Sequence, residues 1–354
     1  MEKKYKPKME FFASSNSYSG FRTYFDKIFN SYEYDRIFVL KGGPGTGKST
    51  LMRKVANIYD NEKNTLELFR CSSDKNSLDA VIIERDGKRV AIIDGTAPHE
   101  RDAVIPGAVD MLINLGEAID ESVLSKKKNE VLKLNCLKKE SYKKTYYNLS
   151  KSSVFASNIK AEIINAHDLE AVSKCCNEII QRLDCTKNER FDLRLISSFS
   201  KEGYSTLDSF KTLDSQCFNV FGTYGSEYIF ITLLSDMLTN KSIPHVKIVS
   251  PLDPEITEAI YFKDSGIAIV GGDGKSPLCD MCEFLRFSNK NSFLKRIEAL
   301  DTCRLNYEKE ASDCLKEASK YHFELEDMYT AAVDFDILNQ KTLYVAEHIS
   351  KIFS

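Results

Sequence analysis

One glycine-rich segment, GGPGTGKST, holds the residues of this sequence whose types and spacing are best suited to chemistry. Its first eight residues fit the pattern G-x-x-x-x-G-K-[ST] of a phosphate-binding loop. Polyphosphate needs several hydrogen-bond donors that converge on one surface, and glycines let the backbone bring its N–H groups there without a side-chain clash. We therefore expect this segment to contact a nucleotide through Gly42, Gly43, Pro44, Gly45, Thr46, Gly47, Lys48, Ser49 and Thr50.

Charged and hydroxyl side chains complete this expected site. Lys48 would place a positive charge at the β- and γ-phosphates, and the Ser49 hydroxyl is short enough to bind Mg²⁺. Thr50 is expected near the α-phosphate. Asp94 directly follows an apolar run, Val90–Ile93, and a carboxylate at the end of a buried strand orients Mg²⁺ directly or through water. We expect Lys48 and Asp94 to be catalytic, Ser49 and Asp94 to bind magnesium, and ATP or GTP to be the ligand.

The residue that would position water for hydrolysis is less clearly marked. Strong ATPases often carry a glutamate directly after the strand aspartate, whereas Gly95 follows Asp94 here. The nearby alternatives are His99, Glu100 and Asp102. The alternatives for a γ-phosphate contact are Arg70, Arg85 and Arg101, and the sequence does not choose among them. Slow turnover is therefore expected.

Strands and helices must hold these residues in place. Ile37–Leu40 is a short apolar run that a glycine ends, which is typical of a buried strand. Leu51, Val55 and Ile58 follow the loop at helical spacing. Further strands are expected at Leu66–Phe69 and Val90–Ile93. Strands that alternate with helices predict an α/β fold with a mainly parallel sheet flanked by helices.

The distribution of turn residues divides the chain. All 16 glycines and all 8 prolines lie outside 117–202 and 278–354, so both of those regions are expected to be helical. We predict an intact P-loop module at 1–116, a helical extension at 117–190, a degenerate P-loop-like module at 191–277 and a second helical extension at 278–354.

Short sequence matches between the two halves predict an internal duplication. SSNSYSGF (Ser14–Phe21) is echoed by SSFSKEGY (Ser197–Tyr204), and RVAIIDG (Arg89–Gly95) by GIAIVGG (Gly266–Gly272). Further matches keep the same order along the chain, and such repeats indicate tandem units.

The second copy lacks the charges of the first. In GTYGSEY (Gly222–Tyr228) no lysine follows the glycines, and Glu227 or Tyr228 takes the lysine's place in the sequence match. Gly271 stands where the first copy has its strand aspartate. We expect this module to be structural, with a regulatory or partner-binding role as the alternative.

Charge and hydropathy limit the classes of partner that we expect this protein to bind. The net charge of -3 gives no overall attraction to nucleic acid or to an anionic membrane. Residues 126–151 hold nine lysines against Glu130 and Glu140, which is typical of a solvated helix face, with nucleic-acid binding as the alternative. The charged first residues lack the apolar run of a signal peptide, and no stretch is long and apolar enough for a membrane span. The expected location is therefore cytoplasmic. The sequence identifies no protein partner.

Four segments together resemble a known family. They are FFASSNSYSGF (Phe11–Phe21), LKGGPGTGKST (Leu40–Thr50), RCSSDKNSLDAVII (Arg70–Ile83) and VAIIDGTAPH (Val90–His99). The chain resembles an uncharacterised bacterial family of tandem P-loop proteins whose members are labelled ATPases or nucleotide kinases. The resemblance implies two P-loop NTPase modules with helical extensions. Family members generally carry the phosphate loop in both modules, and this chain departs from them in its second half.

Together these patterns predict magnesium-dependent binding of a nucleoside triphosphate, ATP first, with slow hydrolysis in the first module. A kinase for a small molecule or nucleotide is the first alternative, in which the lysine-rich region after residue 116 closes as a lid. A nucleotide-gated switch without turnover is the second. The motifs Cys71–Asp74 and Thr96–His99 are hypothesised to lie on the γ-phosphate side.

Overall fold

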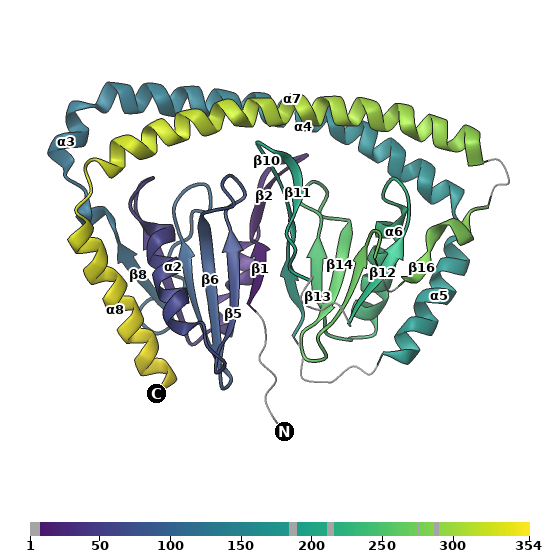
Figure 1. The fold of residues 1–354 in the computed structure, drawn as a ribbon, viewed down its shortest axis with the longest axis horizontal. Helices are drawn as coiled ribbons and strands as arrows, with labels where there is room; N and C mark the ends of the chain where they lie inside the picture. Colours follow the sequence, from purple (N-terminus) through teal and green to yellow (C-terminus); the bar gives the residue numbers. More distant parts are fainter. Residues whose placement is uncertain (1–7, 184–189, 211–215, 275–276, 287–289) are drawn as a thin grey trace.

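The computed structural model describes residues 8–183, 190–210, 216–274, 277–286 and 290–354. Two α/β modules lie side by side, and two long helices run across both of them (Figure 1). We call residues 8–116 the first module and residues 190–286 the second module. No helix among these described residues is long and apolar enough to cross a membrane.

A six-stranded sheet forms the first module. Its strands are β1 (Met9–Phe12), β4 (Arg36–Lys41), β5 (Thr65–Arg70), β6 (Leu78–Arg85), β7 (Lys88–Asp94) and β8 (Asp110–Asn114). Their order across the sheet is β1-β5-β6-β7-β4-β8. The interior of β4 and β7 is a continuous apolar run buried on both faces, as expected for central strands. The remaining elements are β2 (Ser14–Ser17), β3 (Gly20–Thr23), α1 (Phe25–Ile28), a 3-10 turn (Ser31–Glu33), α2 (Lys48–Tyr59) and a 3-10 turn (Gly116–Ala118).

The second module repeats this arrangement. Its sheet contains β9 (Asp192–Arg194), β12 (Cys217–Phe221), β13 (Val246–Val249), β14 (Thr257–Phe262), β15 (Ile267–Gly271) and β16 (Pro277–Asp280). Read from β9, the order is β9-β13-β14-β15-β12-β16, which matches the first sheet strand for strand. The module also has β10 (Ser197–Ser200), β11 (Gly203–Thr206), α6 (Ser226–Asn240) and a 3-10 turn (Met281–Phe284).

Both sheets are mixed rather than parallel throughout. In the first, β6 runs antiparallel to β5 and to β7, while the other pairs are parallel. In the second, β14 runs antiparallel to β13 and to β15. The short connections β5–β6 and β6–β7 leave no room for the crossover helix that a parallel pair requires. The expected α/β class with mostly parallel strands is thus confirmed, with one antiparallel strand in each sheet.

Most of the two regions without glycine or proline is helical, but the end of the first region, expected to be helical as well, forms strands β9 and β10. The helices are α3 (Glu121–Lys126), α4 (Lys128–Ala166), α5 (Leu169–Arg182), α7 (Lys290–Thr330) and α8 (Phe335–Phe353). Helices α4 and α7 have 39 and 41 residues, so each is about 60 Å long. They pack antiparallel, because Leu134 near the start of α4 meets Leu325 near the end of α7, whereas Ile159 meets Ile297.

The helical segments are exchanged between the modules. Helix α5, which follows the first module in sequence, packs on the second through Val172 and Cys176 against Phe230. Helix α8, which follows the second module, packs on the first through Val345 and Ile349. Figure 1 shows α8 beside α2 at one end of the molecule and α5 beside α6 at the other. Each module is therefore completed by helices from the opposite half of the chain.

The modules meet around an approximate two-fold axis. Phe12 and Leu195 exchange backbone hydrogen bonds of 2.8 and 3.3 Å. Asn16 Nδ2 donates to the Phe199 carbonyl at 2.8 Å. In the sequence match of the halves, Phe12 is the counterpart of Leu195 and Asn16 that of Phe199, so matching positions face each other. One apolar core is continuous across this contact.

Candidate functional site

The glycine loop (Gly42–Gly47) connects β4 to α2. Gly45 has φ 69° and Gly47 has φ 71°, in the left-handed region that favours glycine. Helix α2 begins at Lys48, directly after Gly47. The backbone therefore turns tightly and leaves the N–H groups of the loop and of the first helical turn on one side. Such a concave set of donors at a helix N-terminus is suited to an anion.

Lys48 lies across the mouth of the glycine loop. Its Nζ donates to the carbonyl oxygens of Gly42 at 3.0 Å and of Gly43 at 2.7 Å. The same Nζ is 3.8 Å from Asp94 Oδ2. Thr46 Oγ1 also donates to the Gly43 carbonyl, at 2.8 Å, and helps to hold the loop closed. The lysine charge is thus placed between the loop and the carboxylate at the end of β7.

Asp94 lies at the point where the sequence places a magnesium ligand. It ends β7 and is the register partner of Leu40, just before the loop. Its Oδ1 accepts hydrogen bonds from the Thr96 N–H at 2.9 Å and from Thr96 Oγ1 at 2.5 Å. Burial raises the pKa of Asp94, while Lys48 opposes this rise. Its Oδ2 faces Lys48 Nζ, and the metal role of Asp94 stays a prediction.

Ser49 and Thr50 differ in their surroundings. Ser49 Oγ accepts the Leu78 N–H at 2.9 Å, which fixes the hydroxyl beside the start of β6. Thr50 is exposed on the first turn of α2. The metal role of Ser49 and the phosphate role of Thr50 stay predictions.

Sequence reasoning missed Asp79. This residue lies in β6 directly before Ala80, the register partner of Ile93, so it is adjacent to Asp94 across the sheet. It is 5% exposed, and its Oδ2 is 3.2 Å from His99 Nε2. The sequence signal was present, because Asp79 is an acid within the apolar run Leu78–Ile83 of β6.

His99 is buried with Asp79. Its ring stacks on Phe25 at 4.4 Å between centroids. Burial acts to lower the pKa of His99, but the Asp79 charge and hydrogen bond, with a further contribution from Asp94, raise it overall. Of the three residues considered for positioning water, His99 is the one that lies beside the carboxylates. Glu100 is exposed, and Asp102 forms an ion pair with Lys41 at 2.7 Å.

The geometry explains why glycine follows Asp94. A Cβ atom built on Gly95 would lie 2.4 Å from Val39 Cγ1 and 2.9 Å from the Arg101 carbonyl oxygen. A glutamate at this position has no space, so its absence is a consequence of packing.

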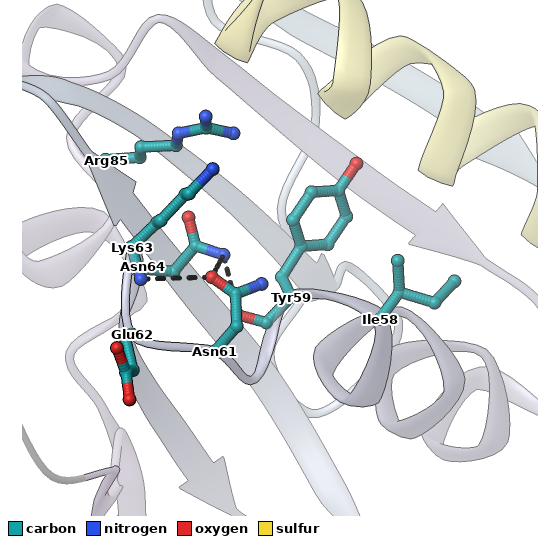
Figure 2. Close-up of a pocket in the computed structure, with 7 residues that line it drawn as sticks. All are labelled: Ile58, Tyr59, Asn61, Glu62, Lys63, Asn64 and Arg85. Carbon is teal, nitrogen blue, oxygen red and sulfur yellow. Dashed lines mark hydrogen bonds between the residues drawn. The ribbon is translucent and has the colours of Figure 1, made fainter.

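The three arginines considered for the γ-phosphate have other contacts. Arg101 is buried and donates to Ser31 Oγ at 2.9 Å. Arg70 forms an ion pair with Glu10, at the edge of the sheet formed by β1 and β5. Arg85 lies at the opposite end of α2, in the pocket of Figure 2.

That pocket is distinct from the glycine loop. It has a volume of about 490 Å³ and is lined by Ile58, Tyr59, Asn61, Glu62, Lys63, Asn64 and Arg85. It adjoins the last residues of α2, a helix of 12 residues that is about 18 Å long. A phosphate bound at the first turn of α2 would therefore be far from this pocket.

Helices α7 and α8 cover the glycine loop. Built Cβ atoms on the loop glycines would lie 2.7 Å from the Tyr329 ring (Gly43), 2.5 Å from Thr330 Oγ1 (Gly45) and 3.0 Å from Leu338 Cδ1 (Gly47). These covering residues belong to the opposite half of the chain. No sequence motif marked them, because their role depends on how α7 crosses the module.

The motif Cys71–Asp74 adjoins the buried pair of Asp79 and His99. Burial raises the pKa of the Cys71 thiol well above its ordinary value, and Asp79 raises it further. Ser73 is close enough to Tyr142 of α4 to lower its pKa against the effect of burial. The motif thus links the buried acids to the long helices, and its expected position on the γ-phosphate side stays a prediction.

The corresponding loop of the second module corrects one expectation. Gly225 has φ 92° and precedes α6, as Gly47 precedes α2, but the loop between Gly222 and the helix is two residues shorter than its counterpart. Ser226 therefore stands at the position of Lys48, and Glu227 stands at that of Ser49. The prediction that Glu227 or Tyr228 takes the lysine's place is wrong, because the sequence match did not include this deletion.

The donor set fits a hard cation that also binds phosphate. Among the described residues no three His, Cys, Asp or Glu side chains form a metal site by themselves. Magnesium commonly uses one or two carboxylates together with substrate phosphates and water. The buried Asp79 lies beside Asp94 across the sheet, but its Oδ2 faces His99 Nε2 at 3.2 Å.

Comparison with known proteins finds a partial similarity to an ATPase. The protein "AAA-ATPase ASD, mitochondrial" from Arabidopsis thaliana is 33% identical over 90 residues. The match covers 25% of this chain and 17% of that protein. No family model matches the chain, and no solved structure matches it. The resemblance to a bacterial family of tandem P-loop proteins stays a prediction.

Proposed function

We propose that the first module binds a magnesium complex of a nucleoside triphosphate, ATP first, and hydrolyses it slowly. The observation that carries this proposal is the position of Lys48 Nζ, between a left-handed glycine loop and Asp94. The partial similarity to an ATPase supports the same reading. The second module, which lacks both charges, has a structural or regulatory role in this proposal.

In this proposal each group of residues in the first module has a separate role. Backbone N–H groups of the glycine loop and of α2 bind the phosphates, and Lys48 exchanges its contacts with Gly42 and Gly43 for phosphate oxygens. Ser49 and Asp94 would hold magnesium, which neutralises charge that develops on the phosphates. Asp79 and His99 form a buried pair beside Asp94. Turnover is slow because Gly95 leaves no space for a carboxylate that activates water.

A nucleotide-gated switch is the second candidate. The end of α7 lies directly over the glycine loop, and α7 also crosses the other module. A nucleotide bound at the glycine loop would therefore contact α7, a helix that crosses both modules.

The proposal is tested with Lys48→Ala beside the wild type. Loss of the charge-assisted contacts should weaken Mg²⁺-dependent ATP binding by about tenfold to about a hundredfold and abolish phosphate release. Binding is measured by calorimetry and phosphate release by a coupled assay. Lys63→Ala, in the pocket of Figure 2, is the matched control and should bind as the wild type does. Equal binding by Lys48→Ala and wild type, or loss in Lys63→Ala alone, would contradict the proposed site.

A further inference from the structure

The last turns of α7 place a carboxylate at the glycine loop. A Cβ atom built on Gly45 would lie 2.7 Å from the Glu326 carbonyl oxygen and 3.2 Å from Glu326 Cγ. The Gly45 N–H is also close enough to act on the pKa of the Glu326 carboxyl. Glu326 therefore lies against a loop residue whose N–H a phosphate would need.

The charges around Glu326 agree with this position. Burial raises the pKa of Glu326, and Asp74 raises it further. Lys48 and the Gly45 hydrogen bond act in the opposite direction. The carboxylate thus lies within the field of the lysine that is expected to bind phosphate.

The glycine loop of the second module also contacts a carboxylate, and there the carboxylate belongs to the loop's own helix. Glu227 is 9% exposed, and the backbone N–H groups of Gly225 and of Glu227 itself lower the pKa of its carboxyl against the effect of burial. A Cβ atom built on Gly222 would lie 2.5 Å from Glu227 Oε2. The carboxylate belongs to the helix that the loop begins, so it stays in place. The glycine loop of each module therefore contacts a carboxylate.

In the first module the carboxylate comes from a separate helix. Its neighbours on α7, Tyr329 and Thr330, contact the loop glycines, while Leu325 and Met328 of the same turns pack on Leu134 of α4. At the other end of the long helices, Ile159, Ile163 and Ile297 form an apolar cluster that packs on Ile229 of the second module.

We propose that Glu326 competes with the phosphates of the nucleotide for the glycine loop, so that binding requires the end of α7 to leave the loop. The proposal rests on the proposed function and adds its regulation. Occupancy of the loop would then be coupled to the position of α7, which spans both modules.

Three variants test this competition with the full chain. Glu326→Gln removes the competing charge and should tighten binding of the β,γ-imido analogue of ATP with Mg²⁺ by about tenfold. Asp327→Asn removes a charge from the same turn without the Gly45 contact, and its affinity should stay within about twofold of the wild type. Tyr329→Trp introduces the sole tryptophan of the chain, above Gly43. Its emission should shift to longer wavelength when the analogue saturates the protein.

The outcomes distinguish the competition by Glu326, which we call the gate, from the nucleotide-binding site itself. If Glu326→Gln binds as the wild type does, or no more tightly than Asp327→Asn, the gate is refuted while the nucleotide site stands. An unchanged emission of Tyr329→Trp at saturation, with binding followed independently by calorimetry, also refutes it. If neither the wild type nor Glu326→Gln binds the analogue, the proposed function fails and the gate fails with it. Binding by Glu326→Gln alone supports a gate that is closed in the wild type.

Discussion

Asp79 and Glu258 occupy matching positions, because Ala80 pairs with Ile93 and Ala259 pairs with Val270 in the two sheets. Their partners differ. Asp79 faces His99, whereas Glu258 receives hydrogen bonds from neutral groups that include the Tyr204 hydroxyl. Burial raises the pKa of Glu258 from 4.5 to about 7, and its hydrogen bonds only partly oppose this rise. The same strand position therefore holds an acid that faces a histidine in one module and an acid surrounded by neutral hydrogen-bond donors in the other.

This difference predicts a pH-dependent stability. Between the two pKa values of Glu258, 4.5 and about 7, the folded protein binds a proton that the unfolded chain has released. Stability therefore falls as pH rises through this window. Glu258→Gln keeps the shape and removes the charge. It should raise the free energy of unfolding by up to about 3 kcal/mol at about pH 8.5 and have little effect at about pH 4.

Urea unfolding at the two pH values measures this effect. Glu178→Gln, at an exposed position on α5, should change stability by less than about 0.5 kcal/mol at either pH. An equal gain for Glu258→Gln at both pH values would show that charge burial is not its cause.

At the scale of elements, α8 connects the end of the chain to the nucleotide site. Val345 and Ile349 are fully buried against α2 and the first sheet. The same helix carries Leu338, which contacts Gly47 of the glycine loop. Packing of α8 thus stabilises the first module and sets one wall of its loop.

Removing one buried side chain from α8 tests this role. Ile349→Ala should lower the free energy of unfolding by about 2–5 kcal/mol, because it creates a cavity in the core of the first module. Leu343→Ala, on the same helix at a position that is 62% exposed, should cost less than about 0.5 kcal/mol. Both are measured by urea unfolding. Equal effects of the two variants would contradict the packing of α8 on the first module.

At the scale of the whole molecule, buried charges hold the modules together. Arg194 of β9 is fully buried and contacts Glu67 of β5 at 2.8 Å and Asp192 at 2.7 Å. Burial acts to raise the pKa of Glu67, but Arg194, Lys263 and Arg89 hold it well below its ordinary value. The contact of Arg194 with Glu67 crosses from the second module to the first. The two sheets are therefore joined by a buried ion pair as well as by the apolar core.

Truncation of Arg194 should weaken the contact between the two modules. Arg194→Ala leaves two buried carboxylates without their main partner and should cost about 3–5 kcal/mol. The control Lys174→Ala breaks an exposed pair with Glu170 and should cost less than about 0.5 kcal/mol. Urea unfolding followed by circular dichroism gives both values. A change in Arg194→Ala no larger than the control would refute the role of this contact.

The sequence by itself determined the local features of the molecule. Glycines at fixed spacing require a tight loop, an apolar run ended by Asp94 requires a buried strand, and the lack of glycine and proline permits helices of 39 and 41 residues. The colinear matches predicted two similar modules, and the equal strand order is what a duplication predicts. These inferences succeed because they depend on short-range geometry and on the period of the apolar residues.

Only the tertiary structure decided which distant segments meet. The exchange of α5 and α8, the contact of Glu326 with Gly45 and the pairing of Asp79 with His99 join residues that no sequence spacing relates. The deletion that moves Ser226 to the lysine's position also became visible only in three dimensions. Such contacts arise because apolar faces far apart in the chain bury each other, and the free energy of that burial does not depend on sequence separation.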